Sequence, residues 1–323
     1  MDSAIFEICY DAYKNNFYQG NGWKELAEQF GFVSGEILRS QFKRERRKRG
    51  LPSKNDLLQP EKIKEKNEYK FPRIGILDLE TLPQIIYTWD IYQPNNSEQI
   101  ISDACLLSWS GKYLNESEIF SDILTSKEAP QKSDERIVKS CWKFMQTCDV
   151  LVGHNFQNFD QKLINTRFLK YGLAPLKFVI IDTYLIAKQN FRFSSNKMKF
   201  INEQLGIRNK IDNDGFKLWR ACHEGKQEAL DTMLDYNIGD VYASESLMYR
   251  LRPYIRNFNV ALYNEINDYQ CPVCGSTNLK TEGFYITPAG KYESIRCQDC
   301  LCISRKKENL LDKDKRKHLL VNS

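Results

Sequence analysis

One short stretch, residues 73–81, constrains the fold of this chain more than any other. It reads Arg-Ile-Gly-Ile-Leu-Asp-Leu-Glu-Thr, an apolar run of strand length that ends in two acids, Asp78 and Glu80. Side chains two positions apart on a strand lie on the same face, so both carboxylates leave the strand together. Neighbouring carboxylates repel one another and resist burial, and a divalent metal ion is the natural group to stabilise them. An Asp-x-Glu pair is common by chance, so a metal site here requires further ligands elsewhere.

The composition and the cysteines indicate the class of protein. The chain has 323 residues, of which 41% are hydrophobic and 28% charged, as in ordinary globular proteins. It has no apolar run of membrane-spanning length, and its first residues do not resemble a signal peptide. Half of the ten cysteines lie within residues 271–302, which predicts a reducing compartment and one metal-binding knot rather than a disulfide scaffold. We therefore expect a cytoplasmic protein. A bacterium or a phage-infected cell is its expected source, which the cysteines do not determine.

Charge is distributed unevenly along the chain. Residues 1–70 hold 14 Lys and Arg against 11 Asp and Glu, and residues 271–323 hold 10 against 6. Residues 71–270 hold 23 against 25. A slightly acidic centre between basic ends suits an enzyme that holds metal ions and acts on a polyanion. An ordinary solvated surface is the alternative, which charge alone leaves open.

The N-terminal residues 1–50 predict a helical module. Apolar spacing indicates helices over 4–18 and 23–31, and Ser34 can cap a third. The expected inner face of the third helix comprises Ile37, Leu38 and Phe42. A helix, a glycine turn and a second helix resemble a helix-turn-helix DNA reader. The third helix ends in a basic run whose expected phosphate contacts are Arg44, Arg46, Arg47 and Arg49. A small bundle with a solvated basic end is the alternative, and residues 51–70 are predicted to be a linker.

Residues 71–260 predict an α/β domain. Strands are expected over 73–81, 84–92 and 99–109 as an antiparallel meander, followed by alternating helices and strands. The later elements are expected at 134–148 (helix), 150–153 (strand), 159–171 (helix), 177–181 (strand) and 226–250 (helix). This order is typical of a mixed sheet flanked by helices.

Two further polar motifs fall on these elements. Asn155, Phe159 and Asp160 follow the strand 150–153, where functional carboxylates of open α/β sheets gather. Tyr236 and Asp240 are four positions apart in the late helix and therefore share one of its faces. Each motif is ordinary by itself, and their order along the chain is the informative property.

Taken in order, these motifs resemble the DEDDy 3′–5′ exonucleases of the ribonuclease H-like superfamily, which include the proofreading domains of family B DNA polymerases. The resemblance covers about residues 71–255. The sister histidine group would need His at position 235, which is Asp235 here. The resemblance implies a ribonuclease H-like five-stranded mixed sheet and hydrolysis of phosphodiester bonds at a single-stranded 3′ end, with DNA favoured over RNA.

The resemblance also implies roles for individual residues. Two Mg²⁺ or Mn²⁺ ions would be bound, one by Asp78, Glu80 and Asp240 and the second by Asp78 with Asp160. Tyr236 would orient the attacking water, and Asn155 and Phe159 would contact the substrate.

Two other functions remain open from the sequence. One is a nucleic-acid-binding regulator that no longer cuts. The other is a structure-specific endonuclease on the same fold, because one fold serves several activities.

The C-terminal cysteines form a separate pattern. Two Cys-x-x-Cys pairs are separated by 22 residues, which predicts one structural Zn²⁺ in a zinc ribbon over residues 268–305. The expected ligands are Cys271, Cys274, Cys297 and Cys300. Cys302 could replace Cys300 as the fourth ligand. Residues 306–323 are predicted to be a basic tail.

Overall fold

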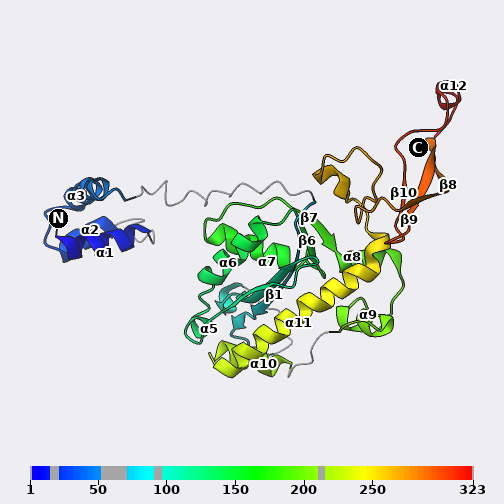
Figure 1. Ribbon diagram of the computed structural model, residues 1–323. Helices are drawn as coiled ribbons and strands as arrows, with labels where there is room; N and C mark the ends of the chain where they lie inside the picture. Colours follow the sequence, from blue (N-terminus) through cyan, green and yellow to red (C-terminus); the bar gives the residue numbers. More distant parts are fainter. Residues whose placement is uncertain (1, 15–21, 52–70, 91–96, 210–214, 322–323) are drawn as a thin grey trace. The chain divides into compact units, whose positions relative to one another are not determined.

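The computed structural model describes residues 2–14, 22–51, 71–90, 97–209 and 215–321 (Figure 1). The chain divides into two compact units. One contains the N-terminal helices, and the other contains the mixed sheet and the C-terminal strands. Almost all of the predicted linker, residues 52–70, lies outside the described residues. None of the helices within the described ranges is long and apolar enough to cross a membrane.

The N-terminal unit has three helices, as predicted. Their bounds are α1 Ser3–Lys14, α2 Gly22–Gln29 and α3 Gly35–Lys48. Ser34 caps α3, since its side chain accepts a hydrogen bond from the amide of Ile37 at 3.3 Å. The helices share one apolar cluster that includes Phe6, Cys9, Leu26, Leu38 and Phe42. The expectation that Ile37 faces inward is wrong, because that side chain is 43% exposed. Residues 15–18 of the predicted first helix lie outside the described residues.

The second unit is built on a five-stranded mixed sheet, which confirms the predicted fold class. Its strands lie in the order β5-β4-β1-β6-β7, with β1 in the centre. Their bounds are β1 Ile74–Leu82, β4 Cys105–Tyr113, β5 Ile119–Ile123, β6 Val150–Gly153 and β7 Val179–Asp182. β4 runs antiparallel to β1 and to β5, whereas β6 runs parallel to β1 and to β7.

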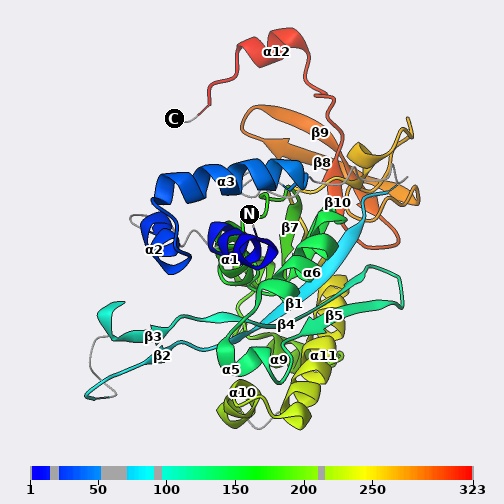
Figure 2. The same cartoon turned by 90° about the vertical axis from the view of Figure 1, so that its left-hand side faces the viewer.

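Helices cover both faces of the sheet (Figures 1 and 2). Successive side chains of β4 show which helix covers which face. The indole nitrogen of Trp109 donates to Ser140 of α6 at 2.8 Å, whereas the hydroxyl of Ser108 donates to Asn237 of α11 at 3.2 Å. The helices of this unit are α5 Glu128–Gln131, α6 Glu135–Gln146, α7 Asp160–Lys170, α8 Thr183–Asn190, α9 Met198–Leu205, α10 Phe216–His223 and α11 Gln227–Leu251. One face of the sheet is therefore covered by α6 and the other by α11.

The predicted three-strand meander is wrong. β1 pairs directly with β4, and only β2 Ile85–Ile86 forms within the predicted strand 84–92. β2 pairs with β3 Ile100–Ser102 in a separate two-stranded sheet, preceded by the 3₁₀ turn η1 Ser97–Gln99. Trp89 is 93% exposed, so its high strand propensity finds no layer to pack against. β5 was not predicted, and residues 91 and 92 lie outside the described residues.

The C-terminal strands form a small antiparallel sheet in the order β10-β9-β8. The elements after α11 are η2 Arg252–Tyr254, η3 Val260–Tyr263, β8 Leu279–Thr287, β9 Gly290–Cys297, β10 Ile303–Arg305 and, in the tail, α12 Lys313–Lys317. One apolar cluster joins Ile76 and Val241 of the large domain to Cys271, Val273 and Cys297. The cysteine-rich turns therefore pack on the same core as the sheet.

Candidate active site

Three of the predicted carboxylates come together. Asp78 and Glu80 lie opposite Ser110 and Ser108 of β4, on the sheet face that α11 covers. One carboxylate oxygen from each of Asp78, Glu80 and Asp240 lies within 4.8 Å of the other two. Asp240 is fully buried, whereas the two acids of β1 are partly exposed. Carboxylate oxygens at this separation fit a shared hard cation such as Mg²⁺ or Mn²⁺.

Asp160 lies beside this group but outside it. It is the first residue of α7, which follows the loop after β6, and it is buried. Burial, together with the charge of Asp78, raises the pKa of Asp160 well above its usual range. The two carboxylates are therefore close enough to repel each other, which favours a cation between them.

A buried asparagine, which the sequence analysis missed, holds one of these acids. The Asn237 side chain donates from Nδ2 to Asp78 Oδ2 at 2.7 Å, and its Oδ1 accepts from Ser108. Asn237 is fully buried and follows Tyr236 in α11. A polar residue between the tyrosine and Asp240 was visible in the sequence, but its partner across the sheet was not.

Asp182 fixes the loop that carries the second motif. At the end of β7, its carboxylate accepts from the backbone N–H of Asn155 at 2.9 Å and of Gln157 at 3.0 Å. It also caps α8 by accepting from the backbone N–H of Tyr184 at 3.0 Å. Asp182 therefore ties the loop before Asp160 to the neighbouring strand.

The predicted substrate-binding residues of this loop differ in exposure. Phe159 is 53% exposed immediately before Asp160, so its ring is available to a ligand. Asn155 is half-buried and has a backbone φ of 62°, in the left-handed region that asparagine tolerates. Their contact with substrate stays a prediction. Both ring nitrogens of His154 are within hydrogen-bond distance of other groups, Thr183 at 3.0 Å and the carbonyl of Asn196 at 2.8 Å.

Tyr236 lies one helical turn before Asp240 on α11 and is half-buried. Its ring packs edge-on against Trp219 of α10, with ring centroids 6.2 Å apart. This contact restricts the tyrosine ring. Its role in orienting water stays a prediction.

The four predicted zinc ligands also come together. The Sγ atoms of Cys271 and Cys300 are 3.5 Å apart, and those of Cys274 and Cys297 are 3.6 Å apart. A tetrahedral zinc site with Zn–S bonds of about 2.3 Å separates its sulfur atoms by about 3.8 Å, so the arrangement fits. Cys302 is buried next to Cys271, but the group of four sulfurs within 4.8 Å contains Cys300 in its place.

One of the four phosphate contacts predicted at the basic end of α3, Arg46, is wrong. Arg46 is only 8% exposed and donates from Nη1 to the carbonyl of Leu51 at 2.9 Å, so its guanidinium stabilises the helical unit. Arg49 forms ion pairs with Glu45 at 3.1 Å and with Glu7 at 3.3 Å. The other two predicted contacts, Arg44 and Arg47, are exposed.

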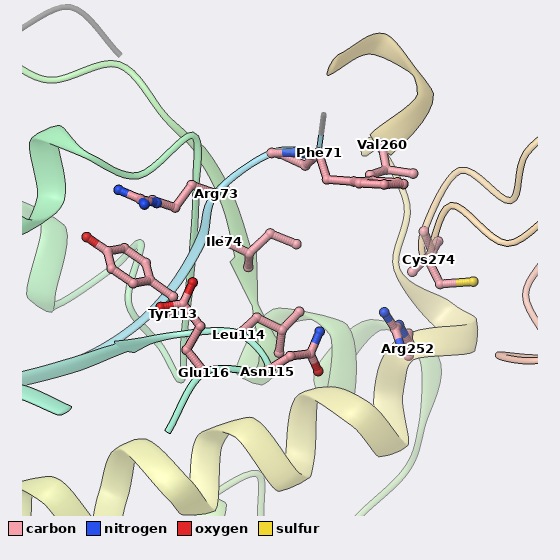
Figure 3. A pocket seen from close by; sticks show the side chains of 12 residues that line it. Phe71, Arg73, Ile74, Tyr113, Leu114, Asn115, Glu116, Arg252, Val260 and Cys274 are labelled. Atoms are coloured by element: carbon pink, nitrogen blue, oxygen red, sulfur yellow. The ribbon is translucent and has the colours of Figure 1, made fainter. Parts of the chain in front are cut away.

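Figure 3 shows a cavity of about 520 Å³ in the same unit as the carboxylates. Residues at the start of β1, the end of β4 and the first cysteine pair line it, among them Phe71, Tyr113 and Cys274. The guanidinium of Arg73 lies over the Tyr113 ring, 4.5 Å from its centroid. None of the acids described above lines this cavity, so we assign it no part in the metal chemistry.

Comparisons with known proteins find similarity to a nuclease superfamily and to segments of DNA polymerases. The RNase_H superfamily model matches residues 107–252, which include Asp160, Tyr236 and Asp240 but begin after Asp78 and Glu80. Among curated proteins, the DNA polymerase III PolC-type of Ureaplasma parvum is 47% identical over 49 residues, and that of Mycoplasma pneumoniae is 35% identical over 88 residues. These segments are 15% and 27% of this chain but span only 3% and 6% of the two polymerases.

Among solved structures, the family B DNA polymerase of the hyperthermophilic archaeon Pyrobaculum calidifontis matches with a TM-score of 0.42 and 15% identity. The match covers 56% of this chain and 25% of that polymerase. The family match over residues 107–252 agrees with the five-stranded mixed sheet and its flanking helices. The mixed sheet and its helices therefore have a ribonuclease H-like fold, and residues 107–252 are similar to the RNase_H superfamily.

Proposed function

We propose that this protein is a metal-dependent 3′–5′ exonuclease of the DEDDy type that trims single-stranded ends of nucleic acid. The observation that carries the proposal is the convergence of Asp78, Glu80 and Asp240 within 4.8 Å, although they come from opposite ends of the domain. Similarity to segments of proteins named as DNA polymerases supports nucleic acid as the substrate and favours DNA over RNA.

The four acids and Asn237 have different roles in the proposed reaction. Asp78, Glu80 and Asp240 would hold one divalent ion, and Asp160 with Asp78 would hold the second. Such a pair of ions supplies activation of water and neutralisation of charge on the scissile phosphate. Asn237 keeps the Asp78 carboxylate aimed toward the site through its 2.7 Å hydrogen bond.

The substrate contacts follow from exposure and position. The exposed ring of Phe159 provides a surface on which the terminal base can stack, and Asn155 lies at the start of the same loop. The hydroxyl of Tyr236 orients the attacking water from the face of α11 that also carries Asp240. The four-cysteine group would hold one structural Zn²⁺, since a site with four protein ligands leaves no open position for catalysis.

The two alternative functions, a non-cleaving regulator and a structure-specific endonuclease, would require different features of the site. A regulator that no longer cuts has no need for four acids at the metal positions, and Asp78, Glu80, Asp160 and Asp240 are all present. A structure-specific endonuclease would use the same acids but would not require a free end.

Substrates labelled at opposite ends distinguish these possibilities. With Mg²⁺ or Mn²⁺, a 5′-labelled single strand should give a ladder that shortens from the 3′ end, and a 3′-labelled strand should release labelled mononucleotide at once. A circular single strand should stay intact, whereas cutting of the circle would identify an endonuclease. Binding without any product, for DNA and RNA alike, would identify a non-cleaving protein.

A further inference from the structure

The hairpin formed by β8 and β9 exposes large apolar side chains. Phe284 is 58% exposed, Tyr285 47% and Ile286 73%, and they follow one another along β8, the strand labelled in Figure 1. The buried part of this small sheet lies elsewhere, at residues such as Ile295 and the cysteines. Strand alternation places Tyr285 on one face of the small sheet and Phe284 and Ile286 on the other, so the three side chains do not form a single patch.

Two tyrosines and an arginine lie together on one face of this sheet. Tyr285 and Tyr292 are direct partners across β8 and β9, so their side chains share a face. Arg305 pairs with Ser294, two positions after Tyr292 in β9, and therefore lies on that face too. Its guanidinium carbon is 3.9 Å from the ring centroid of Tyr292 and 5.9 Å from that of Tyr285. We call these three residues the tyrosine face.

Positive charge continues along the same face. Arg296 is two positions beyond Ser294 in β9 and pairs with Lys280 across the strands. Glu282 forms a 2.6 Å ion pair with Arg296. Together with Arg305, the face thus holds three cations against one acid. Flat rings next to excess positive charge match a polyanion with exposed bases better than they match an apolar protein surface.

We propose that the tyrosine face binds single-stranded nucleic acid, with bases stacked on Tyr285 and Tyr292 and phosphates held by Arg305 and Lys280. This inference rests on the proposed function for the identity of the substrate, and it places a second contact on the strand whose end is trimmed. A duplex fits less well, because its bases are stacked on one another and offer no free faces. A guanidinium stacked on a ring still points its N–H groups outward, where they can reach phosphate oxygens.

The test compares variants that keep or remove the rings. All of them carry Asp240→Asn, so that binding is measured without cleavage, and all are the full chain with its metals. The variant Tyr285→Leu with Tyr292→Leu removes stacking but keeps apolar volume, and Tyr285→Phe with Tyr292→Phe keeps both. Fluorescence anisotropy gives the affinity for a labelled oligothymidylate of about 20 nucleotides and for a duplex of the same length.

We expect the leucine variant to bind the single strand about tenfold more weakly or worse, and the phenylalanine variant to bind within about twofold of the parent. The affinity for the duplex should change less. Arg305→Gln, which leaves the rings in place, should weaken binding and reduce its dependence on salt. Zinc content and circular dichroism equal to those of the parent show that the small sheet remains folded.

Equal single-strand affinity of the leucine variant and the parent would overturn the proposal. So would loss of self-association in the leucine variant with unchanged binding of the oligonucleotide, because the face would then be an interface between copies of the chain. The proposed function is tested separately, by cleavage in the protein that retains Asp240. If binding depends on the rings but the protein that retains Asp240 cleaves nothing, the tyrosine face is supported as a binding surface and the proposed nuclease function is contradicted.

Discussion

Asn237 donates a hydrogen bond of 2.7 Å from its side-chain nitrogen to the carboxylate of Asp78. The asparagine comes from α11 and the acid from the central strand β1, so this bond joins the first motif to the last. Ser108 of the next strand completes the chain of hydrogen bonds by donating to the Asn237 oxygen. The orientation of a proposed metal ligand thus depends on two residues that hold no metal themselves.

Asn237→Ala should reduce both activity and metal affinity, because Asp78 loses the donor that fixes its orientation. Losses of an outer hydrogen bond at metal sites are typically about 10- to 100-fold, and we expect a fall in this range. Ser108→Ala is the matched control, which removes only the second bond and should cost less. Isothermal titration with Mn²⁺ and initial cleavage rates measure the two effects. An Asn237→Ala protein with unchanged metal affinity would show that the bond is not needed.

Asp160→Asn should stabilise the metal-free protein at alkaline pH. Burial, followed by the charge of Asp78, raises the folded-state pKa of Asp160 above its unfolded value. The stability that the protonated acid contributes is therefore full below the unfolded pKa and is lost as pH rises through the folded pKa. Asparagine does not ionise, so the variant should melt higher than the wild type at pH 8 and show little gain near pH 4. A lower melting temperature at pH 8 would contradict this reasoning.

Tyr236→Phe should lower turnover by about tenfold or more, with metal affinity within about twofold of the wild type. The phenyl ring can keep the packing against Trp219, so the variant removes only the hydroxyl. Tyr242→Phe is the control, because it removes a hydroxyl from another tyrosine of the same helix. The ring of Tyr242 packs under the guanidinium of Arg208, 4.3 Å away, and this variant should keep its turnover. Loss of metal binding in Tyr236→Phe would mean that its role is misassigned.

Removal of the proposed Zn²⁺ should destabilise more than the small C-terminal sheet. Cys271 and Cys297 belong to the same apolar cluster as Ile76 and Val241, so disorder at the cysteines should expose part of the main core. We expect one zinc per chain by elemental analysis, and a lower melting temperature for Cys274→Ser. Cys302→Ser should retain the zinc. Zinc loss from that variant would make Cys302 the fourth ligand.

The basic end of α3 should contribute to nucleic-acid affinity through Arg44 and Arg47. Replacing both with alanine should weaken binding and reduce the slope of log K against log salt by about 2 if each contacts one phosphate. Arg46→Leu, the control, should instead lower the melting temperature, because Arg46 bonds to the Leu51 carbonyl. Equal salt slopes for the double variant and the wild type would show that this end of the helix is only solvated surface.

The sequence predicted those parts of the fold that follow local periodicity. The strand of Asp78 and Glu80 and the helix of Tyr236 and Asp240 are present, because apolar spacing and strand alternation determine them. The five-stranded mixed sheet was implied by the family resemblance instead, since periodicity did not predict β5. The strand expected around Trp89 does not form. Strand propensity alone does not produce a strand where no other layer of the protein covers the side chain.

The supporting contacts of the site depended on tertiary structure. Asn237 bonds to β1, and Asp182 bonds to the loop after β6, so each acts on a residue far away in the sequence. In the sequence, Arg46 is one of several cations in a basic run. The structure shows that its side chain is buried, unlike those of Arg44 and Arg47. No local pattern distinguishes these positions from their neighbours.

The most direct test of the carboxylate site compares the wild type with Asp78→Asn and Asp240→Asn on one 5′-labelled single strand. The wild type should give a 3′-shortening ladder with Mg²⁺ and no product with EDTA. Each variant should keep its fold by circular dichroism and lose at least about 100-fold in rate, because each loses a carboxylate that would hold a divalent ion. Mg²⁺-dependent cleavage by both variants at the wild-type rate would contradict the assignment of the site.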